Sequence, residues 1–292
     1  MTDIICIGHI TLDHIVTPSL DVYMPGGTTF YSAHGISHLL ENESSITYKL
    51  IASLAESEMK AVDDIRARGI EVDVIPSRKS VFFENIYGED MNNRTQRVRA
   101  KADPFTVESL KDVEARYIWL GSLLVDDFSL DVVKHLSAKG ALVVDAQGYL
   151  RRVEGEDVFP CEWENKEEFL KHIDILKVNE HEAEVLTGTS NYHEAAQMLS
   201  GWGVKEVLLT LGSEGSIILA DGEFHHIPAY PPKVLCDTTG CGDTYVMGYL
   251  FKRAQGASID EAGCFAAAVS SVKIEKSGPY SGTFEEAENI IK

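Results

Sequence analysis

The chain has 292 residues, with 26 Lys and Arg against 46 Asp and Glu, which gives a formal charge of −20. This acidic balance disfavours nucleic acid as a partner, because a polyanion is bound by clustered Lys and Arg. A hydrophobic content of 44% excludes a wholly disordered chain. No basic leader or run of 18 apolar residues is present, and the five cysteines form no C-x-x-C pair, so we expect a cytoplasmic protein without a membrane segment.

Short apolar runs alternate with helical patterns along the chain. This alternation is typical of βαβ units, in which a mostly parallel sheet is covered by helices on both faces. No linker interrupts it, so we predict a single domain over residues 1–292. Strands are predicted at 4–8, 46–51, 117–120, 141–144, 173–178 and 207–211, and helices at 30–40, 59–68, 130–139, 180–186, 192–202, 243–254 and 259–274.

One region departs from this pattern. Residues 80–87 and 94–100 are extended-looking runs around a polar turn at 88–93, which predicts a β-hairpin outside the parallel sheet. Residues 13–23 are expected to add a further strand. We predict that segments 11–24 and 79–101 form a lid over a site, since such excursions often carry function. An edge hairpin with no functional role is the alternative.

The strongest local signal is the string Asp-Thr-Thr-Gly-Cys-Gly-Asp at residues 237–243, directly before an apolar helical run. Gly240 and Gly242 would let the backbone approach a ligand, and the N–H groups and dipole of the helix favour an anion there. Asp243 cannot bind that anion, but it could accept a proton from an attacking hydroxyl. The alternative is that Asp243 only caps the helix or charges its first turn. We expect Cys241 to be readily alkylated, because a helix N-terminus favours the thiolate.

Two common nucleotide-binding signatures are missing. There is no G-x-x-x-x-G-K-[ST] loop, and Gly8 at the end of the first strand is not followed by a G-x-G-x-x-G pattern. P-loop NTPases and Rossmann dehydrogenases are therefore disfavoured.

Five motifs in order resemble the PfkB carbohydrate kinases, the ribokinase-like family, and the resemblance extends over nearly the whole chain. It implies a ribokinase-like α/β fold with a central, mostly parallel sheet, helices on both faces and a small β-sheet lid. The motifs are the first strand followed by Asp13, the double glycine of residues 25–27, the N-x-x-E element at 176–183, the T-x-G-x-x-G turn at 210–215 and the Asp-Thr-Thr-Gly-Cys-Gly-Asp string at 237–243.

The resemblance implies a catalytic role for residues of the 237–243 string. Asp243 would be the base, and the N–H groups of Gly240, Cys241 and Gly242 would stabilise charge on the transferred phosphoryl group. The family usually has Ala at the position of Cys241. Both residues are small, so the backbone geometry should be kept.

The resemblance also implies a substrate-binding set. It consists of Asp13, Gly26, Gly27 and Tyr31, in which Asp13 accepts hydrogen bonds from two adjacent hydroxyls. The family often has Asn at the position of Tyr31, so an ordinary furanose substrate is doubtful.

Nucleotide and metal sites are implied as well. Thr210, Gly212 and Gly215 would bind the nucleotide, and an adenine pocket is expected near residues 263–273. ATP and Mg²⁺ are the implied cofactors, and K⁺ is a further one in many relatives.

The implied metal ligands fall into two pairs. Asn179 and Glu182 lie one helical turn apart and would hold the water shell of Mg²⁺. Asp237 and the carbonyl of Thr239 would form part of a monovalent cation site, completed from residues 272–281. A solvated helix charge at Glu182 is the alternative.

The expected activity is transfer of the ATP γ-phosphoryl group to a hydroxyl of a small polyol. Residues 28–32, 81–87, 92–97 and 144–151 resemble the inositol-kinase branch, which favours myo-inositol or a related cyclitol. A ribose or fructose kinase, a nucleoside kinase and a non-catalytic ligand sensor on the same fold are the alternatives. Beyond a small polyol or sugar, the expected partner is a second copy of the chain, bound through the lid.

Overall fold

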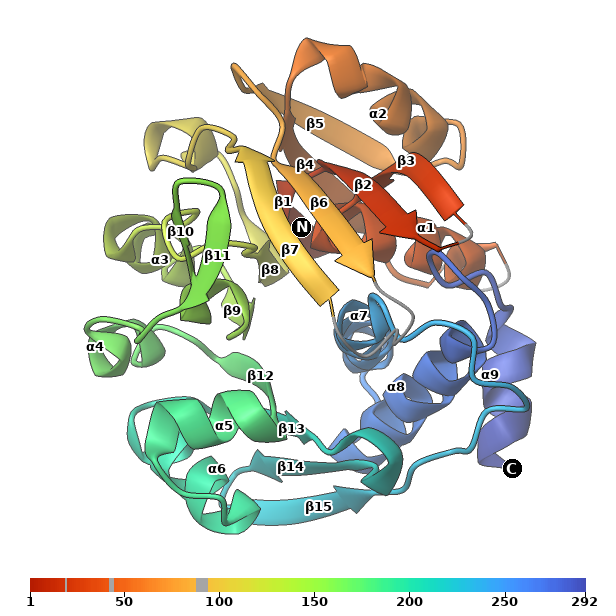
Figure 1. Cartoon of the computed structure of the whole chain (residues 1–292). Helices are drawn as coiled ribbons and strands as arrows, with labels where there is room; N and C mark the ends of the chain where they lie inside the picture. Colours follow the sequence, from red (N-terminus) through yellow and green to blue (C-terminus); the bar gives the residue numbers. More distant parts are fainter. Residues whose placement is uncertain (19, 42–44, 88–93) are drawn as a thin grey trace.

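The structure, a computed structural model, describes residues 1–18, 20–41, 45–87 and 94–292. Its main sheet has nine strands in the order β15-β14-β13-β12-β9-β8-β1-β4-β5 (Figure 1). The strands from β13 to β5 in this order are parallel, and β14 and β15 add an antiparallel edge. The strands are β1 (Thr2–His9), β4 (Tyr48–Leu54), β5 (Glu71–Pro76), β8 (Ala115–Gly121), β9 (Ala141–Asp145), β12 (Ile175–Asn179), β13 (Glu206–Thr210), β14 (Ser216–Ala220) and β15 (Glu223–Ile227).

Helices cover both faces of this sheet, as predicted. The buried side chains form two large clusters, one beneath α1, α2 and α7–α9 and the other beneath α3–α6. No helix of the described residues is long and apolar enough to cross a bilayer. The helices are α1 (Thr28–Leu40), α2 (Met59–Arg66), α3 (Leu130–Ser137), α4 (Lys166–Leu170), α5 (Glu180–Thr187), α6 (Tyr192–Gly201), α7 (Cys241–Ala254), α8 (Ile259–Ile274) and α9 (Phe284–Ile291).

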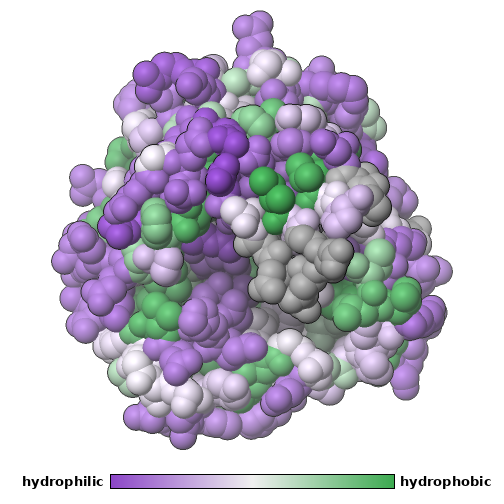
Figure 2. All heavy atoms as spheres, in the orientation of Figure 1, coloured by the Kyte–Doolittle hydropathy of each residue, from purple (hydrophilic) through white to green (hydrophobic). Residues whose placement is uncertain are grey.

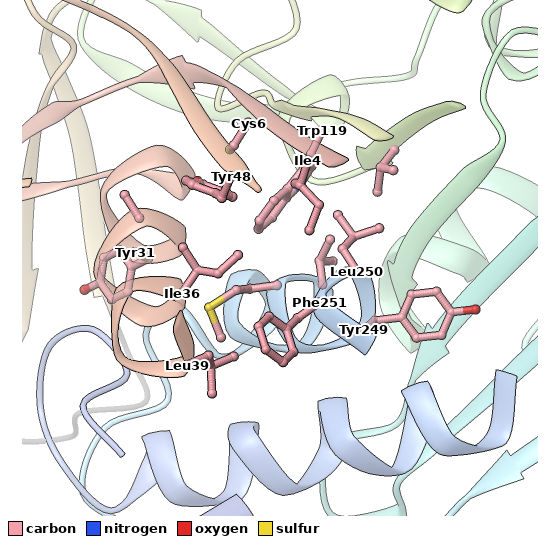
Figure 3. Close-up of a cluster of buried hydrophobic side chains, with 14 of the residues drawn as sticks. Ile4, Cys6, Tyr31, Ile36, Leu39, Tyr48, Trp119, Tyr249, Leu250 and Phe251 are labelled. Atoms are coloured by element: carbon pink, nitrogen blue, oxygen red, sulfur yellow. The ribbon is translucent and has the colours of Figure 1, made fainter. Parts of the chain in front are cut away.

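The first of these clusters fixes α7, the helix that follows the 237–243 string. Leu250 and Phe251 of α7 pack with Ile36 of α1 and with Trp119 of the sheet, all of them almost fully buried (Figure 3). Tyr31 lies on the same side of the sheet, at the edge of the cluster. Because burial of such side chains stabilises the fold by about 1.5–3 kcal/mol each, α7 is held firmly against α1 and the sheet.

A second sheet of six strands, in the order β10-β11-β7-β6-β2-β3, lies in the region predicted as a lid. The predicted hairpin is present, because β6 pairs with β7 in antiparallel fashion; its turn at 88–93 lies outside the described residues. The single strand expected at 13–23 is instead an antiparallel pair. The strands are β2 (Thr11–Thr17), β3 (Leu20–Gly26), β6 (Phe82–Tyr87), β7 (Arg94–Ala100), β10 (Arg151–Glu154) and β11 (Asp157–Pro160).

Some elements were not predicted. They are the β10–β11 hairpin, strands β5, β14 and β15, and helices α4 and α9, all of them short elements of four to eight residues. For β14 the apolar run 217–220 was the available signal. Strand β4 begins two residues later than expected, and α7 begins at Cys241, two residues before the predicted start. Asp243 lies in the first turn of α7, as predicted.

Candidate active site

The parallel strands place polar residues along one edge of the main sheet. Asp145 ends β9, Asn179 ends β12 and Thr210 ends β13, so all three lie at carboxyl ends of parallel strands, where ligand crevices form in α/β proteins. In the space-filling view, hydrophilic side chains line a recess between the second sheet and the region of β12 and β13 (Figure 2). The candidate site is built around this edge.

The loop that precedes α7 has the geometry expected of an anion-binding turn. Gly240 has φ of 74°, in the left-handed region that favours glycine, and its carbonyl accepts from the N–H and the hydroxyl of Thr244 at 2.9 and 2.8 Å. The N–H of Cys241 donates to Thr238 O at 3.2 Å, so in this structure that donor bonds within the loop. The N–H groups in the first turn of α7 that have no partner within the helix, together with the helix dipole, favour an anion at this end.

Asp243 has the electrostatics of a proton acceptor. Burial raises the pKa of its carboxyl to about 6, the charge of Asp145 adds to the increase, and a hydrogen bond from Thr28 and the charges of Lys177 and Arg151 oppose it. A carboxylate with this pKa is mostly deprotonated at neutral pH and more basic than an ordinary Asp. It therefore combines the charge state and the basicity that a general base needs.

The acceptor side of the site is formed by the double glycine and Asp13. Asp13 lies within β2, where its carboxylate accepts from the hydroxyl of Thr11 at 2.7 Å. A Cβ added at Gly26 would collide with that carboxylate, and Gly27, with φ of 87°, turns the chain into α1. The glycines therefore allow Asp13 to lie against the backbone at the start of α1.

Tyr31 connects the acceptor side to the loop before α7. Its ring lies so close to Gly240 that an added Cβ there would collide with it. Burial raises the pKa of the Tyr31 hydroxyl, and the charges of Asp237, Asp13 and Asp243 add to the increase. An aromatic wall is therefore present where acidic residues from three segments converge.

Asn179 and Glu182 form a capping box at the start of α5. The Asn179 side chain accepts from the N–H of Glu182 and the Glu182 carboxylate accepts from the N–H of Asn179, both at 2.8 Å. The structure thus brings the predicted pair together, in a contact that we did not predict. The spacing Asn-x-x-Glu before a helix is itself the sequence signal for this cap.

Lys177 is a site residue for which we predicted no role. Its side chain is almost fully buried, with Nζ 3.0 Å from Asp145 Oδ2 and 3.7 Å from Glu182 Oε2. A Cβ added at Gly242 would lie 3.0 Å from that Nζ, so the ammonium lies directly beneath the anion-binding turn. Burial alone would lower the pKa of Lys177, but the charges of Asp145 and Glu182 raise it. A Lys within the apolar run 173–178 was the available signal, since Lys is almost never buried unpaired.

The T-x-G-x-x-G turn lies beside these residues. The Thr210 hydroxyl donates to Val178 O at 3.4 Å, and Gly212 has φ of 54° with open space where a side chain would project. Gly215 has φ of 94°, and its missing side chain lets the turn lie against the Ile227 carbonyl. A cavity of 320 Å³ borders the turn, and no residue of the 237–243 string lines it.

Comparison with known proteins places this geometry in a family. Residues 150–286 match the model of the pfkB family carbohydrate kinases. A solved pyrophosphate-dependent kinase in the ribokinase family, complexed with a pyrophosphate analogue and myo-inositol, is 30% identical over 98% of this chain and 99% of its own, with a TM-score of 0.85. The chain belongs to the ribokinase-like PfkB family. The predicted fold is therefore confirmed.

Other relatives support the same family. A cytidine kinase of Thermococcus kodakarensis is 25% identical over 89% of this chain and 92% of its own. The structure of Arabidopsis thaliana ribokinase with ribose and ATP shares the fold at 20% identity, a TM-score of 0.78 and coverage of 100% and 99% of the two chains. This PfkB kinase is accordingly a phosphotransferase with a hydroxyl acceptor, within the sugar and nucleoside kinases.

The residues around Lys177 suit Mg²⁺, which takes oxygen ligands and keeps several waters. Of the predicted pair, Asn179 and Glu182 cap α5, and the Glu182 carboxylate shares the Lys177 ammonium with Asp145. These two carboxylates carry one more negative charge than the ammonium balances, so they would hold Mg²⁺ only through its waters, and the ion would supply positive charge to the phosphoryl oxygens. Among the described residues there is no cluster of three or more His, Cys, Asp or Glu side chains that could ligate a metal directly.

The expectation for Cys241 was wrong. Burial raises the pKa of its thiol to about 11, and the charge of Lys273 opposes that rise only in part. Desolvation of the thiolate outweighs the stabilisation by the helix dipole, because the side chain is partly enclosed between the helix and its surroundings.

Proposed function

We propose that this kinase transfers the γ-phosphoryl group of ATP to a hydroxyl of a cyclitol such as myo-inositol, or of a closely related small polyol. The observation that carries the proposal is the position of Asp243 in the first turn of α7, with a pKa raised to about 6 and a hydrogen bond from Thr28. Thr28 follows the double glycine, so the proposed base is in contact with the acceptor side.

The chemistry follows from these positions. Asp13 accepts hydrogen bonds from two acceptor hydroxyls, and Asp243 takes the proton of the hydroxyl that attacks the phosphoryl group. The first turn of α7 stabilises the charge on the transferred group through its N–H donors and dipole. Lys177, beneath Gly242, places an ammonium next to the transferred group, although Asp145 and Glu182 balance its charge.

The preference for a cyclitol has two supports. Tyr31 provides an aromatic wall next to Asp13, and a ring of hydroxyls with an apolar face suits that combination. The solved kinase bound to myo-inositol is similar over nearly the whole chain at 30% identity, whereas the Arabidopsis ribokinase shares 20%.

Pyrophosphate is a second candidate donor. The kinase solved with a pyrophosphate analogue and myo-inositol is described as pyrophosphate-dependent, and it resembles this chain from end to end. A phosphoryl donor that lacks a nucleobase, such as pyrophosphate, would be bound by the start of α7, Lys177 and Mg²⁺. It would not need the adenine pocket expected near residues 263–273. In that region, Gly263 serves to pack α8 against Ile218 and Ile227.

Assays that combine two donors with several acceptors test both the proposed donor and the proposed acceptor. ATP and pyrophosphate are each assayed with myo-inositol, ribose, fructose, cytidine and adenosine, and product is followed by ³¹P NMR. We expect the highest kcat/KM for myo-inositol. A ribose or nucleoside value about tenfold higher would end the cyclitol proposal and leave the kinase assignment in place. Acceptor binding by calorimetry without turnover from either donor would favour a ligand sensor.

We further propose that the second sheet acts as a lid and as the surface of a homodimer. Its strands carry Tyr23 and Ile86, which are large, exposed apolar side chains at 59% and 37%. Its inner side packs Phe83 and Val98 against Leu124, which follows β8. Closure of such a lid would exclude water and so prevent hydrolysis of the donor. Sedimentation of the wild-type protein and of a Tyr23→Glu variant would test the dimer.

A further inference from the structure

A second buried lysine lies on the other side of the loop that leads into α7. Lys273, in the last turn of α8, is 2% exposed. Its Nζ donates to the carbonyl oxygen of Asp237 at 2.8 Å and lies 3.6 Å from Asp237 Oδ2. A buried ammonium is stable only if it is paired and hydrogen-bonded, so this contact with Asp237 is a built feature of the fold.

The loop is tied to the end of α8 at several further points. The N–H groups of Cys236 and Asp237 both donate to Ile274 O, at 3.0 and 3.2 Å. The Asp237 carboxylate also accepts from the Ser277 hydroxyl at 3.2 Å and from the N–H of Gly278 at 3.4 Å. Lys273 is therefore the charged member of a bonded junction that fixes where the loop begins.

Asp237 is held as a carboxylate at this junction. Burial would raise its pKa, but the N–H of Thr239, at 2.9 Å from Oδ1, and the charge of Lys273 lower it below the ordinary value. The charge of Lys273 also reaches Cys241 at the start of α7, where it lowers the pKa of the thiol against the larger effect of burial. The ammonium thus acts on both ends of the loop.

These contacts conflict with the monovalent cation site that the family resemblance implied at Asp237 and Thr239. A K⁺ ion is bound by carbonyl and carboxylate oxygens. Here the carbonyl of Asp237 is bonded to the Lys273 ammonium, and the same ammonium lies against the carboxylate. Two positive charges in contact with one set of oxygens repel each other strongly when they are buried. The residues present do not fit K⁺.

We propose that the ammonium of Lys273 is a built-in cation that fixes the loop before α7, so that phosphoryl transfer by this kinase does not depend on a monovalent cation. Lys273 is a positioning residue, because it acts on Asp237 and through the loop rather than on the substrate. The proposal rests on phosphoryl transfer itself and on neither the donor nor the acceptor proposed above.

The test compares salts at one ionic strength: KCl, NaCl, NH₄Cl and tetramethylammonium chloride. For the wild-type kinase we expect kcat to agree within about twofold in all four and Tm to agree between KCl and tetramethylammonium chloride. For Lys273→Ala in tetramethylammonium chloride, we expect kcat to fall by about 10- to 100-fold and Tm to fall. KCl or NH₄Cl should restore part of both, because the vacated oxygens can then bind the ion. Lys276→Ala, at an exposed position near the end of α8, is the matched control.

Two results would overturn the proposal. The first is activation of the wild-type kinase more than about fivefold by KCl. The second is loss of kcat and Tm in Lys273→Ala with no recovery in KCl or NH₄Cl, which would show a purely structural lysine. Lys273→Gln, which keeps a donor for the Asp237 carbonyl, replaces the alanine variant if that variant does not fold. The Tm measurements need no substrate, so they test Lys273 even if every proposed donor and acceptor fails.

Discussion

Replacing Asp243 by Asn separates the catalytic role of this carboxylate from its cost to stability. The folded-state pKa is about 6 against 3.8 for an ordinary Asp. The deprotonated form therefore dominates above pH 6, and at pH 5 only about one-tenth of the molecules carry it. We expect kcat of the wild-type kinase to fall about tenfold between pH 8 and pH 5, and Asp243→Asn to lower kcat by about 10²–10⁴ and to remove that pH dependence.

The same pKa has a consequence for stability. Because it is raised in the folded state, the charged carboxylate destabilises the fold above pH 6, and this penalty disappears as the pH falls from 6 toward 4. At about 1.36 kcal/mol per pKa unit, and allowing for partial exposure, Asp243→Asn should be more stable than the wild type by about 1–3 kcal/mol at pH 8. The gain should shrink toward pH 4.

The assay measures kcat at saturating donor and acceptor from pH 5 to 8.5. At saturation, ionisation of the free donor does not contribute to the pH dependence of kcat. Urea unfolding at pH 8 and at pH 4.5 gives the stability difference. The reasoning would be refuted by a variant that keeps more than about a tenth of wild-type turnover, or by one that is less stable than the wild type at pH 8.

Three further predictions concern other parts of the site. Glu182→Gln keeps the cap on α5 but removes a charge, so it should raise the Mg²⁺ concentration for half-maximal rate several-fold. The control is Glu261→Gln, in the similar capping box of α8, which should leave that concentration unchanged. Equal Mg²⁺ titrations of the two variants would exclude Glu182 from the metal site. Iodoacetamide at pH 8 should label the exposed Cys236 well before Cys241, as peptide mass spectrometry would show, and the reverse order would contradict the effect of burial. Gly26→Ala should raise KM for the acceptor about tenfold or more with little change in KM for the donor. The reason is that the added methyl presses on the Asp13 carboxylate, which is proposed to bind the acceptor. Steady-state kinetics in which the two KM values change equally would count against that role of Asp13.

The elements that the sequence predicted best are those whose burial is uniform. The runs at 117–120 and 141–144 are apolar because both faces of a central parallel strand are buried, and they coincide with β8 and β9. Strand β15 has five residues and helix α9 has eight, so each is too short for its pattern to be distinctive, although α9 is amphipathic. Pattern alone predicts such short elements poorly.

The site was predicted as separate motifs but not as a set of contacts. Each motif has a local signature, and the structure does bring Asp13, Tyr31 and Asp243 close together. The contacts of Lys177 with Asp145 and of Lys273 with Asp237 join residues that are more than 30 positions apart. No spacing rule reaches that far along the chain, so even where a Lys within an apolar run signals burial, as at Lys177, its partner cannot be named from the sequence.

The second sheet imposes an order on folding. In the parallel β2–β6 pair Leu12 lies opposite Phe82, and the sheet is extended where Arg97 of β7 pairs with Asp157 of β11. Three distant stretches of chain must meet, and closing such long loops costs entropy before any pairing compensates for it. The main sheet brings these stretches together, because its strands β4 and β5 lie between the first and second stretch along the chain, and β8 and β9 lie between the second and third. We therefore expect the second sheet to form after most of the main sheet, so that its strands pair late in folding.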